Sequence, residues 1–271
     1  MVAVRYGVYT NLSIEGAVDI SKEVISSLEG EDLVLESKLA SVLGEEGVSL
    51  EDMDVDILVS VGGDGTILRA MQKNDAIILG VNAGSIGFLA EVGPDEIPDT
   101  MKKVRDGDYF IERRFKLRTD FRGERLADAV NEAVIHTDTI AKIRHFRIMV
   151  DDQVATELRA DGVIVATPTG STCYAMSVGG PIIDPHVNAF VFVPMAPFKF
   201  AARPMVVPTG ARITVELLMD KGCLVVIDGQ REYHIPGNSS VEFSLSKDYG
   251  RFIRFEDNFY ARMQEKLVGS L

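Results

Sequence analysis

The order of predicted strands and helices changes near residue 102, and this change constrains the fold more than any other feature of the chain. Before this point strands alternate with helices, the strands being predicted at 3–9, 57–61 and 77–82. Alternation of this kind predicts a mostly parallel, doubly wound sheet. We therefore expect an α/β domain over residues 1–102.

Beyond residue 102 the chain is dense in short segments rich in Val, Ile and Phe, with Gly, Pro and Asp between them. Examples are the segments 163–165, 190–193, 213–217 and 224–227. Strand-like segments without intervening helices predict a mostly antiparallel, all-β domain. We place this domain at residues 103–254.

Residues 258–267 return to a helical pattern. Phe259, Met263 and Leu267 recur at i, i+4 and i+8, so they form one apolar stripe that must bury against something. We expect residues 255–271 to pack back on the first domain.

Composition and charge exclude several classes of function. The formal net charge of −13 disfavours binding to nucleic acid or to an anionic membrane, both of which call for a basic surface. The longest apolar run, residues 189–198, contains two prolines and is too short to span a bilayer, so we expect a cytoplasmic protein. Cys173 and Cys223 lack CxxC spacing and the four histidines form no HxH pair, which argues against a zinc site.

The sharpest motif lies in residues 56–68, where a buried strand runs through three glycines into a helix. Glycines let backbone amides approach a ligand closely, and a helix N-terminus attracts anions, so Gly62, Gly63, Gly65 and Thr66 are candidate phosphate-binding residues. The motif is neither a Walker loop, since no GK[ST] follows, nor a GxGxxG fingerprint, since Leu68 stands at its last glycine.

Asp64 is the informative residue of this motif. A carboxylate within a phosphate cradle repels its ligand unless it has a task, such as holding Mg²⁺ or accepting a proton. The alternative is that Asp64 is an ordinary turn residue.

A second motif spans residues 161–174, where a strand beginning near Asp161 ends in a turn rich in hydroxyl groups. Hydroxyls and turn amides can bond base edges and ribose, and Tyr174 offers a flat stacking surface. A Ser/Thr-rich β-turn without a ligand is the alternative.

Residues 62–66 resemble the signature that NAD kinases share with diacylglycerol and sphingosine kinases and, more loosely, with phosphofructokinases. Residues 161–174 resemble a second signature, which belongs to NAD kinases and whose turn binds the adenosine of NAD. Asn131 and Glu132 stand where that family carries an Asn-Glu pair contacting the dinucleotide, and Arg159 matches a family arginine. The resemblance extends from the first predicted strand to residue 263.

This resemblance implies an α/β domain with a Rossmann-like sheet, a β-sandwich domain, and a homodimer or homotetramer. It implies transfer of a phosphoryl group from ATP or polyphosphate to the adenosine-ribose 2′-hydroxyl of NAD, with Mg²⁺ or another divalent cation. Asp64 is then the candidate general base. The residues assigned to NAD are Asn131, Glu132, Arg159, Asp161, Thr169, Thr172, Cys173, Tyr174 and Ser177.

The chain departs from the family pattern at Ser85, where members often have His, and at Cys173, where Ala is usual. Phe88 matches the pattern and could cover the adenine, although a place in the core is an equal alternative. The cations that could neutralise phosphate, besides Arg159, are Lys142, Arg144, Arg147 and Arg203.

Three other functions share parts of these patterns. A lipid kinase would share the glycine motif but lack the turn of residues 167–174. A dinucleotide sensor could retain both motifs, but binding alone does not favour a carboxylate at Asp64. An NADP phosphatase would need a nucleophile or a metal cluster, and the sequence offers no candidate for either.

Overall fold

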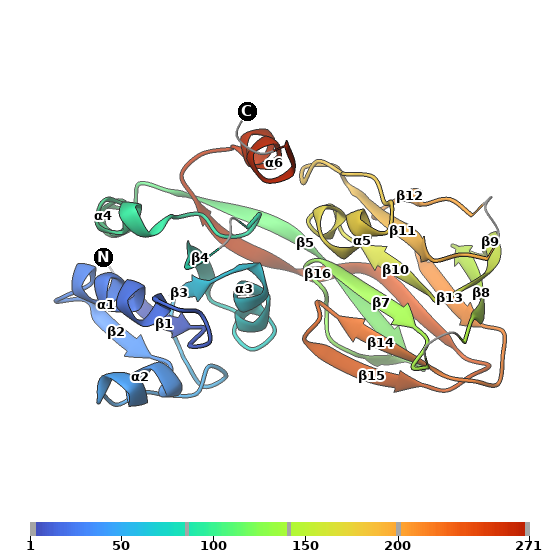
Figure 1. Ribbon diagram of the computed structural model, residues 1–271, viewed down its shortest axis with the longest axis horizontal. Helices are drawn as coiled ribbons and strands as arrows, with labels where there is room; N and C mark the ends of the chain where they lie inside the picture. The colour runs from blue at the N-terminus through green and yellow to red at the C-terminus, as the bar shows by residue number, and fades with distance from the viewer. Residues whose placement is uncertain (1–3, 85–86, 140–141, 199–201, 269–271) are drawn as a thin grey trace. The chain divides into compact units, whose positions relative to one another are not determined.

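The computed structural model describes residues 4–84, 87–139, 142–198 and 202–268 (Figure 1). The chain forms two compact units, the first made of Met1–Arg113 with Gly250–Leu271, the second of Arg114–Tyr249. The chain leaves the first unit within strand β5 and re-enters it within strand β16. The first unit is therefore built from two segments that are distant in the sequence.

A parallel sheet forms the centre of the first unit. Its strands, in spatial order, are β2 (Asp32–Leu35), β1 (Arg5–Thr10), β3 (Ile57–Gly62) and β4 (Ile77–Asn82). The end of β16 (Ser240–Arg254) adds a further parallel strand, with Phe252 opposite Ile78. Every residue of β3 is buried, as expected for a strand covered on both faces. The predicted mostly parallel sheet is confirmed.

The helices of the first unit cover both faces of this sheet. They are α1 (Ala17–Ser27), α2 (Ser37–Leu43), α3 (Asp64–Met71) and α4 (Ile97–Asp106), the last preceded by the turn η1 (Pro94–Glu96). The crossovers β1–α1–β2 and β3–α3–β4 run in opposite directions along the sheet. Since parallel crossovers are right-handed, α1 and α3 lie on opposite faces. α4 packs beside α1, as Figure 1 shows.

The strand order reverses between β1 and β3, which makes this the switch point of the sheet. Ligands of open α/β sheets bind at the carboxyl ends of the strands at such a point. The glycine motif follows β3 directly, and Asn11 follows β1.

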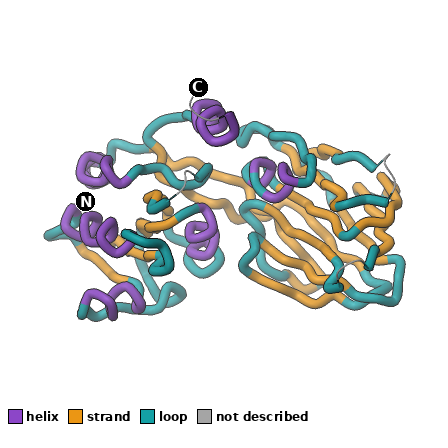
Figure 2. Tube along the Cα trace, in the orientation of Figure 1, coloured by secondary structure: helices purple, strands orange, loops and turns teal. Residues whose placement is uncertain are grey.

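The second unit is built almost entirely of strands, shown in orange in Figure 2, with η2 (Gly170–Thr172) and α5 (Tyr174–Ser177) as short helical turns. One sheet contains parts of β16 and β5 (Phe110–Phe121), together with β6 (Glu124–Arg125), β8 (Arg144–Val150), β9 (Gln153–Ala160) and β13 (Ile213–Leu217). The other contains β7 (Glu132–His136), β10 (Gly162–Ala166), β11 (Ala189–Met195), β12 (Met205–Pro208), β14 (Cys223–Ile227) and β15 (Arg231–Ile235).

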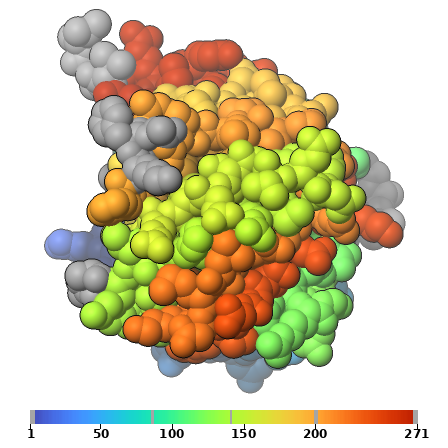
Figure 3. All heavy atoms as spheres, turned by 90° about the vertical axis from the view of Figure 1, so that its right-hand side faces the viewer, coloured from blue at the N-terminus to red at the C-terminus, as the bar shows by residue number. Residues whose placement is uncertain are grey.

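The two sheets of this unit pack face to face over one apolar core. Phe146 and Ile148 of β8 share it with Phe190 and Phe192 of β11, and all four are fully buried. Neighbouring strands of the second sheet are antiparallel throughout. The outer edge of the first sheet is the strand β9, which with β8 forms the yellow-green band of Figure 3. The predicted all-β, sandwich-like domain is confirmed.

The C-terminal helix α6 (Phe259–Val268) belongs to the first unit, as predicted. Its Phe259 ring lies 6.4 Å from the ring of Phe88. The predicted apolar stripe is wrong at one position, because the side chain of Leu267 is 40% exposed. The face of α6 that makes contact is centred on Phe259 and Arg262, so Leu267 falls at its margin.

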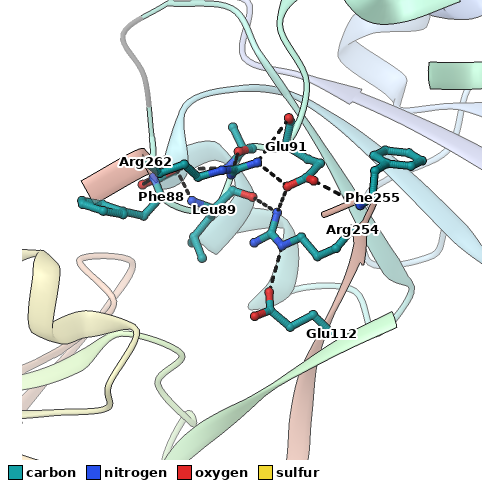
Figure 4. A network of polar contacts seen from close by, with 9 residues as sticks. Phe88, Leu89, Glu91, Glu112, Arg254, Phe255 and Arg262 are labelled. Atoms are coloured by element: carbon teal, nitrogen blue, oxygen red, sulfur yellow. Dashed lines mark hydrogen bonds and ion pairs between the residues drawn. The ribbon is translucent and has the colours of Figure 1, made fainter. Parts of the chain in front are cut away.

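A buried ion network ties this returning segment to the loop after β4 (Figure 4). The carboxylate of Glu91 lies between Arg254, 2.8 Å away, and Arg262. Arg254 also contacts Glu112 at 2.8 Å and donates to the carbonyl of Leu89. The side chains of Glu91 and Arg254 are only 3% and 6% exposed. The network joins three segments that are far apart in the sequence.

We predict that Glu91→Ala destabilises the protein by about 3–5 kcal/mol, because it leaves buried guanidinium groups without their carboxylate. Urea unfolding at neutral pH measures the effect. The control is Asp106→Ala, which removes an exposed partner of Lys102 and should cost less than about 1 kcal/mol. Equal losses from both changes would show that the buried network does not hold this unit together.

Candidate active site

The glycine motif of the first unit forms the junction between β3 and α3. Gly62 ends the strand, Gly63 is the N-cap residue, and α3 begins at Asp64. A Cβ at Gly62 would lie 2.4 Å from Thr66 Oγ1, so only glycine fits there. A Cβ at Gly63 or Gly65 would meet no atom within 4 Å. The backbone is therefore open to a ligand at both of these positions.

The Asp64 carboxylate is held by the loop that follows β4. Its Oδ2 accepts the N–H of Phe88 at 2.8 Å, and its Oδ1 accepts those of Leu89 at 3.0 Å and Ala90 at 3.4 Å. Gly87 lies so close that a Cβ would be 1.9 Å from Oδ1. Asp64 therefore fixes a second loop, which is more than a turn residue does.

Thr66 is tied to the end of β1. Its hydroxyl accepts a hydrogen bond of 3.3 Å from the Nδ2 of Asn11, and its side chain is buried. Asn11 also anchors its own loop through a backbone bond to Val61. No motif surrounds Asn11 in the sequence, so its place beside Thr66 follows only from the pairing of β1 with β3.

Phe88 is 7% exposed, and its ring lies against Phe259 of α6. Within the first unit the ring is thus a packed side chain. Ser85, the first departure from the family pattern, lies outside the described residues.

The second unit contains a cavity of about 540 Å³ beside β7. Three residues assigned to NAD line it, namely Glu132, Asp161 and Tyr174. The remaining lining residues are Val134, His136, Thr137, Asp138, Met195, Val226 and Gly229. Tyr174 is 45% exposed, so its side chain is accessible to a stacking partner.

Two buried side-chain oxygens near this cavity lack a hydrogen-bond partner within the described part of the chain. They are Oδ1 of Asn131 and Oε2 of Glu132, in residues that are 3% and 8% exposed. Burial, together with the charge of Asp228, raises the pKa of Glu132 to about 8. Buried polar atoms without partners are uncommon in folded proteins, so these two oxygens are candidate ligand contacts.

Asp228 organises the backbone of this pair. Its carboxylate accepts the N–H groups of Val130 at 2.9 Å, Asn131 at 2.8 Å and Glu132 at 3.2 Å. The residue has φ 51°, a left-handed conformation that Asp tolerates. Asp228 and Gly229 form the turn between β14 and β15, and no sequence motif marks them.

The hydroxyl-rich turn packs directly on Asn131. A Cβ at Gly170 would lie 2.2 Å from the carbonyl oxygen of Asn131, and the Nδ2 of Asn131 donates to Cys173 Sγ at 3.3 Å. The structure thus joins the second motif to the Asn-Glu pair, which the sequence only suggested by spacing.

Most hydroxyls of this turn bond its own backbone. Thr172 donates to the carbonyl of Thr169 at 3.2 Å, and Ser177 donates to that of Tyr174 at 2.8 Å. Thr169 and Thr172 are buried. These hydroxyl bonds brace the turn.

Arg159 lies apart from this group, exposed on the edge strand β9, and is not among the residues that line the cavity. Two of the other candidate cations form ion pairs within the second unit, and the partner of Arg144 lines the cavity. Arg144 contacts Asp138 at 3.0 Å, and Arg147 contacts Glu157 and Glu216.

Comparison with known protein families assigns this architecture. Residues 15–109 match the ATP-NAD kinase N-terminal domain, and residues 130–255 match the ATP-NAD kinase C-terminal domain. The chain belongs to the NAD kinase family. It is therefore an enzyme, and the match to NAD kinases favours this prediction over the lipid kinase, sensor and phosphatase alternatives.

Relatives match over nearly the whole chain. The NAD kinase of Methanothermobacter thermautotrophicus is 41% identical over 97% of this chain and 96% of its own length. That of Methanosarcina mazei is 42% identical over 97% and 93%. Among solved structures, an NAD kinase from Archaeoglobus fulgidus in complex with ATP is 29% identical, with a TM-score of 0.78 and coverage of 98% and 100%. Yeast NADH kinase complexed with NADH, 21% identical with coverage of 98% and 88%, shares the fold at a TM-score of 0.89.

No helix among the described residues is both long enough and apolar enough to cross a membrane.

The raised pKa of Glu132 predicts a pH dependence of stability. An unfolded chain ionises this group near pH 4.5, whereas the native protein keeps it protonated up to about pH 8. The native state therefore binds more protons in this window. The contribution of Glu132 to stability is complete below about pH 4.5 and is lost as the pH rises toward 8.

Glu132→Gln cannot ionise and should lack this loss. The unfolding free energy of the variant minus that of the wild type should therefore increase by an amount on the order of 3 kcal/mol from pH 5 to pH 8. Urea unfolding of both proteins across this range tests the prediction, with the exposed Glu124→Gln as control. Parallel curves for Glu132→Gln and wild type would contradict it.

Proposed function

We propose that this enzyme transfers the terminal phosphoryl group of ATP to the adenosine-ribose 2′-hydroxyl of NAD, forming NADP. The observation that carries the proposal is the pair of unpartnered buried oxygens at Asn131 and Glu132, beside a cavity in a chain of the NAD kinase family. The relative from Archaeoglobus fulgidus in complex with ATP supports ATP as the donor.

The cavity of the second unit suits an adenosine. An adenine amino group can donate to a buried acceptor, and a ribose diol can bond a carboxyl group. Glu132 and Asp161 present carboxyl groups to the cavity, and Tyr174 presents a ring. We propose that the adenosine of NAD binds to these residues and to Asn131. The turn that Thr169, Thr172, Cys173 and Ser177 form completes this binding site.

The glycine motif of the first unit suits the donor phosphates. It lies at the switch point of the sheet and at the N-terminus of α3, where free N–H groups and the helix dipole favour anions. The open backbone at Gly63 and Gly65 allows a phosphate to approach.

Asp64 is our candidate for the base that accepts the ribose proton. A carboxylate offers about four acceptor positions, and the loop amides occupy two on Oδ1 and one on Oδ2. One position on Oδ2 therefore stays available for the hydroxyl proton. Because phosphoryl transfer has a loose transition state, a carboxylate held in a fixed plane contributes mainly through positioning.

A divalent cation fits the site as part of the donor. The described residues contain no group of three His, Cys, Asp or Glu side chains that could hold a metal ion. Mg²⁺ commonly binds through one or two carboxylates and the substrate's phosphates. We assign the cation to the donor's phosphates, so Mg²⁺–ATP is the substrate.

The test is a coupled assay with NAD, Mg²⁺ and ATP or polyphosphate, in which an NADP-specific dehydrogenase detects the product. We expect NADP with ATP, no phosphorylated product from 2′-deoxy-NAD, and loss of activity in excess EDTA. Phosphorylation of 2′-deoxy-NAD would place the reaction on another hydroxyl. Full activity in EDTA would remove the cation from the mechanism.

Asp64→Asn tests the role of the carboxylate. Loss of a general base typically lowers turnover by about 10²–10⁴. NAD binding, measured by calorimetry, should change little, because Asn131 and Glu132 remain. Asn replaces one acceptor oxygen with an amide NH₂, so one loop N–H loses its partner, and a melting curve must accompany the assay. A fall in turnover of less than about tenfold would assign the base elsewhere.

A further inference from the structure

A lysine of the C-terminal helix reaches the glycine motif of the first unit. The Nζ of Lys266 lies 3.9 Å from Oδ2 of Asp64 and 4.2 Å from the centre of the Phe88 ring. Oδ2 is also the atom that accepts the N–H of Phe88. The ammonium group thus stands beside the carboxylate oxygen that the loop amides leave partly open.

The helix holds this lysine in place. Phe259, Arg262 and Lys266 recur at i, i+3 and i+7, so they share one face of α6. Phe259 packs on Phe88, and Arg262 donates to the carbonyl of Ala90 and contacts Glu91. The contacts of Phe259 and Arg262 therefore fix the helix face that carries Lys266. The position of its ammonium group does not depend on the flexible lysine side chain alone.

Stability alone is a weak reason for this contact. The side chain of Lys266 is 32% exposed, and ion pairs of that kind contribute little to folding. The buried pair of Arg262 with Glu91 already attaches the helix. A cation at this position has a clearer purpose when an anion enters the loop.

The donor brings several negative charges to a loop that already carries the Asp64 carboxylate, in a chain of net charge −13. An ammonium group has three donors in a rotatable head, so it can keep one toward Asp64 and turn the others to phosphate oxygens. The cations expected from the sequence, Lys142, Arg144, Arg147, Arg159 and Arg203, all belong to the second unit. Lys266 places a positive charge at the glycine motif itself.

We infer that Lys266 binds the terminal phosphates of the donor and offsets their repulsion by Asp64. The inference rests on the proposed function, because it names a further donor-binding residue of the same site. The sequence did not indicate this role for Lys266, because the apolar stripe at 259, 263 and 267 predicts that the adjoining side of the helix is the buried one.

The experiment compares Lys266→Met, which keeps the aliphatic stem, with Lys266→Arg, which keeps the charge. Lys102→Met is the matched control, since it removes a lysine that pairs with Asp106 on α4. A lost charge-assisted hydrogen bond corresponds to about a tenfold to hundredfold rise in the KM for ATP. The KM for NAD should stay within about twofold, and Lys266→Arg should restore most of the loss.

Calorimetric binding of ATP and of tripolyphosphate, with melting curves, completes the design. We expect both ligands to bind Lys266→Met about tenfold or more weakly, with unchanged melting. Unchanged affinity and KM would overturn the inference. Equal weakening of ATP and NAD, or lowered melting with no rescue by Arg, would also overturn it and show a structural role. A wild type that binds ATP but forms no NADP would contradict the proposed function, and the binding data would still decide the role of Lys266.

Discussion

The buried carboxylate of Glu91 is the interaction on which the first unit depends. It holds Arg254 at the end of β16 and Arg262 on α6, and the backbone around it belongs to the loop after β4. That same loop donates three N–H groups to Asp64. The ion network therefore supports the loop whose amides hold Asp64 of the glycine motif. Since a buried charge is costly when left alone, the network also favours the association of the three segments.

Each unit uses an aspartate to shape the backbone at its candidate binding residues. Asp64 accepts amides of the loop after β4, and Asp228 accepts the amides of residues 130–132. The two differ in what remains free. Asp228 is 4% exposed and holds the amides of residues 130–132. Asp64, in contrast, keeps an open position on Oδ2 beside Lys266. The Asp64 carboxylate therefore has two roles, since it holds the loop after β4 and also faces the proposed ligand.

The sequence predicted the features that depend on local pattern. Alternating elements indicated the parallel sheet, β4 and β13 were placed at their observed bounds, and the glycine motif lies at a strand–helix junction. It failed where a role depends on a distant partner. The sequence does not single out Asp228, because the three amides bound to its carboxylate belong to residues far away in the chain. The contact face of α6 was misjudged because hydrophobicity marked Leu267, whereas Arg262 and Lys266 make the polar contacts.

The first unit is assembled from both sides of the second unit's sequence, and this has a consequence for its biogenesis. Asp64 and the loop after β4 leave the ribosome well before Arg254, Arg262 and Lys266 are translated. Until then β4 lacks its neighbour β16, and Glu91 lacks both guanidinium groups. The nascent parallel sheet exposes an unpaired edge while the intervening β unit is made, the kind of surface that chaperones recognise. The phosphate loop is thus completed late in synthesis, although its glycines are among the early residues of the chain.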